Sequence, residues 1–113
     1  MIDGELLGAH RQELRRGTVV LACLMALRAP GYGYALIKTL DAAGIPSDAN
    51  TIYPLLRRLE ERNLLESAWN TEEARPRKFY RTSPAGEALA KQLLSDMTEL
   101  TASLQALNEG DPR

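Results

Sequence analysis

The residues best suited to chemistry lie in one segment near the middle of the chain, residues 47–60. Apolar residues at positions 52, 55, 56 and 59 recur at helical spacing, so one face of the predicted helix is suited to burial. The opposite face carries the polar side chains of Asn50, Tyr53, Arg57 and Arg58. Asparagine can bond an adenine edge in two places, and arginine can do the same with guanine. This face therefore predicts contact with bases in a DNA groove.

Basic side chains gather again shortly after this segment, in a loop with Pro76 at its tip; they are Arg75, Arg77, Lys78 and Arg81. Such side chains suit phosphate contacts, which position a protein on DNA and make its affinity salt-dependent. The net charge of the chain is −1, but residues 51–81 hold seven Lys/Arg against five Asp/Glu. Positive charge is thus concentrated where DNA contact is predicted.

Two plainer interpretations stand beside this one. The polar helix face can be ordinary solvated surface, with Arg57 paired to Glu61 one turn on. The basic loop can be an ordinary hairpin loop, which Glu72 and Glu73 would favour. The neighbouring elements favour DNA, because a short helix, a turn through Ile45 and Pro46, the polar helix and a basic hairpin are the parts of a winged helix-turn-helix.

The elements that position these residues follow from periodicity and caps. A largely apolar helix is predicted over residues 14–27, preceded by an amphipathic extension over residues 1–13. A second helix spans 34–43 and ends at Gly44, and Ser47 is predicted to cap the third. Strands over 64–69 and 78–82 form the hairpin, where Trp69 either packs the strand end or lines a cavity. Ser83 and Pro84 begin a last helix that runs to residue 108.

The last helix carries an apolar stripe with steps of four and three residues, made of Leu89, Leu93, Met97, Leu100, Leu104 and Leu107. This spacing resembles that of a coiled coil. The stripe can pack onto its own domain, but residues 14–82 already form a complete small unit. We therefore expect the helix over 83–108 to form a homodimer, which would present two polar helices to DNA.

Little in the sequence favours catalysis or metal binding. The lone Cys23 lies in the most apolar segment and predicts a buried, inert thiol. His10 is the single histidine and has no partner cysteines at metal-ligand spacing. We expect no enzyme activity, no metal and no cofactor. The length of 113 residues predicts one domain, 1–113. The chain has no apolar run of membrane-spanning length and no basic, signal-like start, so a cytoplasmic location is expected.

Several of these motifs match a known pattern. The chain resembles the PadR-like transcriptional regulators over roughly residues 14–90. The resemblance rests on residues 14–18, 32–37, 51–60 (Thr-Ile-Tyr-Pro-Leu-Leu-Arg-Arg-Leu-Glu), 64–67, 77–80 and 82–86. It also accounts for Pro54, which is unusual inside a helix but common in this family.

The resemblance implies an α+β, mostly helical winged helix-turn-helix that acts as a homodimeric repressor. Compact members with one C-terminal helix resemble sensors that release DNA when a ligand binds near the dimer centre. Some stack planar drugs on a tryptophan of the last helix, which has no aromatic residue here. If an effector exists, we expect a small apolar compound bound by Leu6, Leu7, His10, Leu14, Leu93 and Met97. These residues can equally fill the dimer core.

The sequence thus predicts a repressor that binds a pseudo-palindromic operator. From the second helix, Tyr34 and Lys38 would hold phosphates. The groove contacts would come from Asn50, Thr51, Tyr53, Arg57 and Arg58. The flanking backbone or minor groove would be gripped by Arg75, Arg77 and Lys78. The alternative is a winged-helix protein-interaction module that dimerises without specific DNA.

Overall fold

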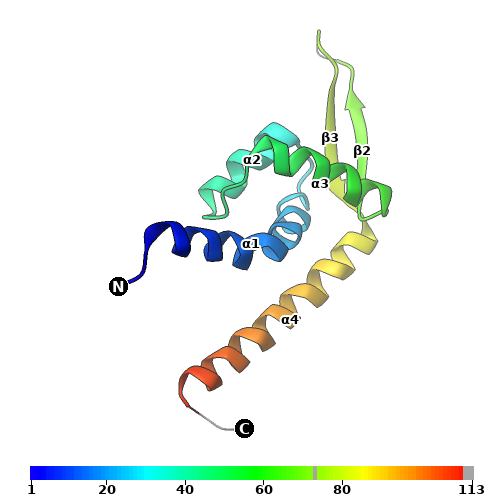
Figure 1. Cartoon of the computed structure of the whole chain (residues 1–113). Coiled ribbons are helices and arrows are strands. Elements are labelled where there is room, and N and C mark those ends of the chain that lie inside the picture. Colours follow the sequence, from blue (N-terminus) through cyan, green and yellow to red (C-terminus); the bar gives the residue numbers. More distant parts are fainter. Residues whose placement is uncertain (73, 111–113) are drawn as a thin grey trace.

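The computed structural model describes residues 1–72 and 74–110. The elements of this part of the chain are α1 (Gly4–Ala26), β1 (Gly31–Tyr32), α2 (Gly33–Ala42), α3 (Ala49–Glu61), β2 (Leu65–Asn70), β3 (Arg77–Thr82) and α4 (Pro84–Asn108). Figure 1 shows the β2–β3 hairpin projecting from one side of the body and α4 leaving on the opposite side. The molecule is consequently elongated, with principal extents of 59 × 33 × 21 Å.

The three strands form one antiparallel sheet in the order β1-β3-β2. The hairpin is close to its predicted position, although β2 begins at Leu65 rather than at Leu64. The reason is that the Leu64 amide still bonds to the Leu59 carbonyl, at 2.9 Å, and so closes the end of α3. The sequence did not reveal β1, because two residues are too few to show an alternating pattern.

The core lies where α1, α2, α3 and the sheet meet. The second half of α1 contributes Leu21, Cys23 and Leu24, which confirms that the apolar run of this helix is central. The predicted inner face of α3 is also buried, with Ile52 and Leu56 fully inaccessible to solvent. Complete burial of such side chains contributes about 1.5–3 kcal/mol each. The orientation of α3 is therefore fixed by its packing against the core.

Helix α1 is one continuous helix from Gly4, and it crosses the predicted division at residue 14 without a break. Its first turn is capped by Asp3, whose carboxylate accepts from the Leu6 amide at 3.4 Å. Glycines within the first half of the helix do not interrupt it. This half extends beyond the core, so Leu14 is 78% exposed.

The turn between α2 and α3 confirms one predicted cap and corrects another. Gly44 ends α2 with a φ of 86°, and the following Ile45 amide bonds to the Leu40 carbonyl at 2.8 Å. The N-cap of α3 is Asp48, not the predicted Ser47, because the Asp48 carboxylate accepts from the Thr51 amide at 2.9 Å. An aspartate also places its negative charge at the positive end of the helix dipole. Helix α3 accordingly starts at Ala49.

The beginning of α4 is anchored as predicted. The buried Ser83 hydroxyl accepts from the Gly86 amide at 3.0 Å and donates to the Asn63 carbonyl at 2.7 Å. Pro84 occupies the first helical position. Gly86 packs against the Leu64 carbonyl so closely that an added Cβ would lie 2.1 Å from its oxygen. The root of α4 is thus fixed to the end of α3 and the start of β2.

Candidate nucleic-acid interface

Helix α3 has three different sides around its buried face. Asn50 and Arg57 are exposed on the side opposite the core. Tyr53 is turned toward α2 and the hairpin, and its ring lies against the backbone of Gly33, where an added Cβ would be 2.5 Å from the nearest ring atom. Thr51 and Arg58 lie on the side of α1 and line a recess there. The structure thus separates the five predicted groove residues into three groups.

The hairpin is tied to α3 through Glu60. The Glu60 carboxylate accepts from the Ser67 hydroxyl on β2 and from the Lys78 ammonium on β3, the latter at 2.9 Å. These two hydrogen bonds, from Ser67 first and Lys78 second, lower the pKa of Glu60 below its ordinary range. The Lys78 side chain is only 30% exposed. Lys78, predicted as a phosphate contact, is therefore placed to hold the hairpin against α3.

We expect this attachment to weaken in acid. Because the pKa of Glu60 is lowered in the folded protein, the carboxylate stabilises the fold above the ordinary glutamate pKa, and that contribution is lost as pH falls through the lowered value. Glu60→Gln should therefore destabilise the protein at pH 7. The difference in stability from wild type should shrink as the pH falls below the ordinary glutamate pKa of about 4.3. Chemical denaturation at a series of pH values checks this. A difference that stays constant across the series would contradict it.

Aromatic and basic side chains meet in a shallow recess of about 230 Å³ between α2, α3 and the hairpin. The Arg77 guanidinium stacks on the Tyr32 ring, 3.8 Å from its centroid. The Tyr32 hydroxyl accepts from the Asn70 side-chain amide at 2.9 Å. Trp69 lines this recess and is 61% exposed, so the prediction that it packs the strand end is wrong and the cavity alternative holds. The loop end of the paired strands is thus attached to Tyr32.

The first turns of α2 add a cation beside this recess. Tyr34 and Lys38 are both exposed, and the Lys38 ammonium lies 4.6 Å from the centroid of the Tyr34 ring. A hydrogen bond from Lys38 lowers the pKa of the Tyr34 phenol. Arg75 is exposed in the hairpin loop, while Glu73, which favoured the plainer interpretation of this loop, lies outside the described residues. Cationic groups thus lie on both α2 and the hairpin, on either side of Tyr53.

The predicted stripe of α4 divides into two parts. Leu89 and Leu93 are partly buried against the core of their own chain. The remaining members of the stripe are exposed in the single chain: Met97 at 37%, Leu100 at 64%, Leu104 at 62% and Leu107 at 66%. Leu94, which the stripe did not include, is also exposed, at 44%.

Most of the residues predicted to hold an effector are exposed in the single chain. Leu6 and Leu14 are exposed on α1, as is His10, while Leu7 is half-buried. None of these, nor Leu93 or Met97, lines any of four well-formed recesses among the described residues. An effector site made of this set would need a second chain to close it.

Residues 1–72 and 74–110 show no features of a metal site, a membrane-spanning helix or a nucleophilic cysteine. No three of their His, Cys, Asp and Glu side chains are grouped to hold a metal ion. No helix in these ranges is long and apolar enough to cross a membrane. Cys23 is fully buried, and burial raises the pKa of its thiol to about 12. A thiol with such a pKa is not a nucleophile at neutral pH.

Comparison with known proteins identifies the family. Residues 20–92 match the model of the transcriptional regulator PadR-like family. A PadR-family transcriptional regulator from Eggerthella lenta is 43% identical, with a TM-score of 0.89 over 93% of this chain and 94% of its own. A PadR-like transcription factor from Bacteroides fragilis is 27% identical, with a TM-score of 0.73 over 88% of this chain and 98% of its own.

A PadR-like regulator from Bacillus cereus, at 22% identity, shares the fold, with a TM-score of 0.77 over 88% of this chain and 99% of its own. No curated protein sequence matches the chain. The family match covers nearly two thirds of the sequence, including α2, α3 and the whole hairpin, and its members are regulators of transcription rather than enzymes. The chain therefore belongs to the PadR-like family of transcriptional regulators.

Proposed function

We propose that the protein is a repressor that binds a pseudo-palindromic operator as a homodimer. The observation that carries this proposal is the exposed polar face of α3, flanked by Lys38 on α2 and by the basic hairpin. In helix-turn-helix proteins the start of the second helix of the motif meets the base edges. That position is held here by Asn50, with Arg57 two turns further on the same side.

The side chains take different parts in this proposal. Asn50, Tyr53 and Arg57 meet the groove, and Tyr34 and Lys38 hold phosphates beside it. Arg75 and Arg77 grip the flanking backbone or minor groove. Lys78 is assigned a positioning part, because Glu60 already engages its ammonium. Thr51 and Arg58 are given no base contact, since they lie on the side of α1.

Specific binding should be dimeric and strongly dependent on salt. Each phosphate contact contributes nearly one unit to the slope of log affinity against log salt concentration. The affinity for the DNA upstream of the protein's own gene is measured at several salt concentrations, with random DNA of equal length as control. Equal affinity for the two DNAs would favour the protein-interaction alternative. Repression itself is checked with a reporter gene placed behind the same DNA.

The groove and phosphate assignments make opposite predictions for two arginines. Arg57→Ala should lower operator affinity by about 1–3 kcal/mol and leave affinity for random DNA nearly unchanged, because a base contact carries the discrimination. Arg77→Ala should weaken both DNAs alike and reduce the salt slope by about one unit. Titrations of both variants against both DNAs check this. If Arg57→Ala weakened both DNAs equally, Arg57 would be a phosphate contact.

A further inference from the structure

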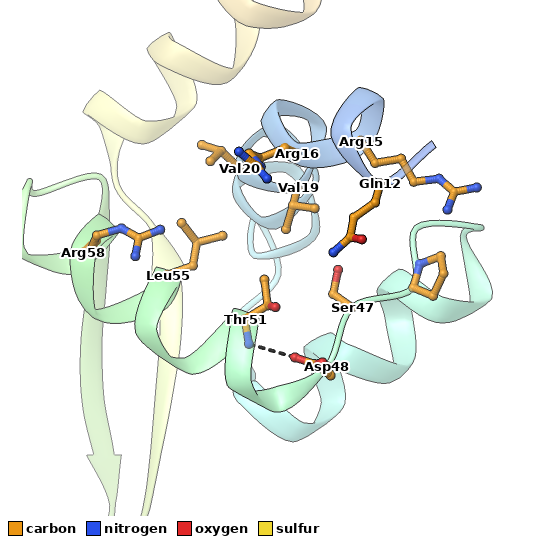
Figure 2. A pocket seen from close by; sticks show the side chains of 11 residues that line it. Gln12, Arg15, Arg16, Val19, Val20, Ser47, Asp48, Thr51, Leu55 and Arg58 are labelled. Atoms are coloured by element: carbon orange, nitrogen blue, oxygen red, sulfur yellow. Dashed lines mark hydrogen bonds between the residues drawn. The ribbon is translucent and has the colours of Figure 1, made fainter. Parts of the chain in front are cut away.

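A recess of about 490 Å³ lies between α1 and the beginning of α3, on the side of α3 away from the hairpin (Figure 2). It is lined by Gln12, Arg15, Arg16, Val19, Val20, Pro46, Ser47, Asp48, Thr51, Leu55 and Arg58. Its size is within the range of cavities that hold small organic ligands. It shares no residue with the effector site predicted from the sequence, and none of the DNA contacts proposed above requires it.

The rim of the recess is cationic. Among residues 1–72 and 74–110, neither Arg15 nor Arg58 forms an ion pair. Arg16 forms a salt bridge with Glu13 at 3.1 Å. Both side chains are largely exposed, so this pair contributes little to stability and leaves the Arg16 charge accessible to a ligand. The single acidic residue in the lining is Asp48, whose carboxylate is already engaged in capping α3. The unmatched charge on the rim favours an anion.

The floor of the recess is apolar. Figure 2 shows Val20 and Leu55 between the side chains of Arg58 on α3 and Arg16 on α1, with Val19 on the other side of Arg16. Leu55 belongs to the buried core, which gives the floor a fixed position. A guanidinium bonds a carboxylate or sulfonate in two places, whereas the valines and the leucine can only pack against an apolar body. We propose that this recess binds a small organic anion that carries its charge on an apolar body.

The geometry favours this ligand over DNA phosphates. Successive residues of a helix are separated by about 100° around its axis, so Arg58 points well away from the groove side that carries Arg57. In Figure 2 the Arg58 side chain points toward Leu55 and the gap between α1 and α3, whereas the Arg15 side chain points away from Arg58. A DNA backbone contacting Arg57 would not enter that gap. Contact of the rim arginines with phosphates is instead an alternative that the experiment tests.

Anilinonaphthalene sulfonate is a suitable probe, and N-phenylnaphthylamine is its neutral match because it lacks only the sulfonate. Titration of the full chain, followed by dye fluorescence, should give one sulfonate dye per chain, bound at least about tenfold more tightly than the neutral dye. Arg58→Gln should weaken the sulfonate dye by about tenfold. Arg62→Gln, at the residue that follows the end of α3 and lies outside the recess, should leave the affinity for the sulfonate dye unchanged.

Charge changes at the mouth provide a second and independent measurement. Gln12 is exposed on α1 and points toward Ser47 across the recess in Figure 2, so substitutions there leave the core intact. Gln12→Lys should strengthen binding of the sulfonate dye, and Gln12→Glu should weaken it. Wild-type binding by both Gln12 variants and by Arg58→Gln would overturn the proposal, as would equal affinity for the two dyes. These titrations contain no DNA, so they stand apart from the proposed operator binding.

Occupancy of the recess should also weaken operator binding; this part rests on the proposed function. The recess extends to Thr51 at the start of α3, and a bound anion neutralises positive charge beside the groove face. Saturating sulfonate dye should lower the operator affinity of wild type, but not that of Arg58→Gln at the same dye concentration. An equal effect on both proteins, or none on wild type, would overturn this coupling. A failure to bind operator without dye would instead count against the proposed function.

The alternative that the rim contacts phosphates is tested with Arg15→Gln and Arg58→Gln. If these variants still bound the dye but showed a smaller salt slope of DNA binding, the rim would be a phosphate contact and the site proposal would be wrong.

Discussion

Leu100→Asp should convert the protein from a dimer into a folded monomer. Leu100 is 64% exposed in the single chain, so the substitution removes no contact from its own core. In the proposed dimer the leucine is buried, and burial of a leucine contributes about 1.5–3 kcal/mol. Because a two-fold interface contains the residue twice, the dimer dissociation constant should rise by about a thousandfold.

Sedimentation at a series of protein concentrations measures this effect. Ser95→Asp is the matched control, because it adds the same charge to the opposite side of α4, where residue 95 is exposed. The control should remain dimeric, and both variants should keep the helical circular dichroism of wild type. An intact Leu100→Asp dimer would show that this stripe does not form the interface. The operator affinity of the monomer should fall as well, since only one α3 would remain for each binding event.

Helix α4 shows which structural features could be predicted from the sequence and which could not. The periodicity of leucines predicted the helix correctly, and four of the six residues of the predicted stripe are exposed in the single chain. It did not reveal that Leu89 and Leu93 pack partly against their own core while Leu100 and the residues after it do not. The spacing along a helix specifies a face, but the point at which that face leaves the core depends on the lengths of the packed neighbours. A three-dimensional arrangement was needed to find that point.

The same reasoning applies to the proposed DNA-binding side. The face carrying Asn50 and Arg57 was found from the sequence because polar and apolar residues alternate there with the period of a helix. The pairing of Glu60 with Lys78 was not found, because the two residues are 18 positions apart and only the register of the hairpin brings them together. A lysine counted as a phosphate contact from composition alone is therefore occupied within the fold. Local sequence patterns predict one helix or strand at a time, and they do not predict contacts between elements.

The anion recess illustrates this limit most clearly. The sequence assigned no site to Arg15 and Arg16, and it predicted Arg58 as a groove contact. They form one rim only because α3 crosses the continuous helix α1 at this level. The division at residue 14 also assigned Gln12 to the extension, apart from Arg15 and Val19, whereas the continuous helix α1 carries all three to one site.

Gly86→Ala should lower the free energy of unfolding by about 3 kcal/mol, toward the upper end of what overpacking costs. The new Cβ would lie 2.1 Å from the Leu64 carbonyl oxygen and 2.8 Å from the Thr82 methyl carbon. The carbonyl cannot simply move aside, because it accepts from the Ser83 amide at 3.1 Å. Relief therefore requires α4 to shift away from the end of α3, which would also disturb the cap that Ser83 provides.

Gly17→Ala is the matched control and should have the opposite sign. Gly17 also lies inside a helix, but an added Cβ there meets no atom within 4 Å. Alanine is favoured over glycine in a helix by about 0.5–1 kcal/mol, so this variant should be more stable than wild type. Urea denaturation of the three proteins at one concentration decides the matter, since dimer stability depends on concentration. Equal stability of the two alanine variants would mean that α4 is not held against Leu64, and that its root is free to reorient.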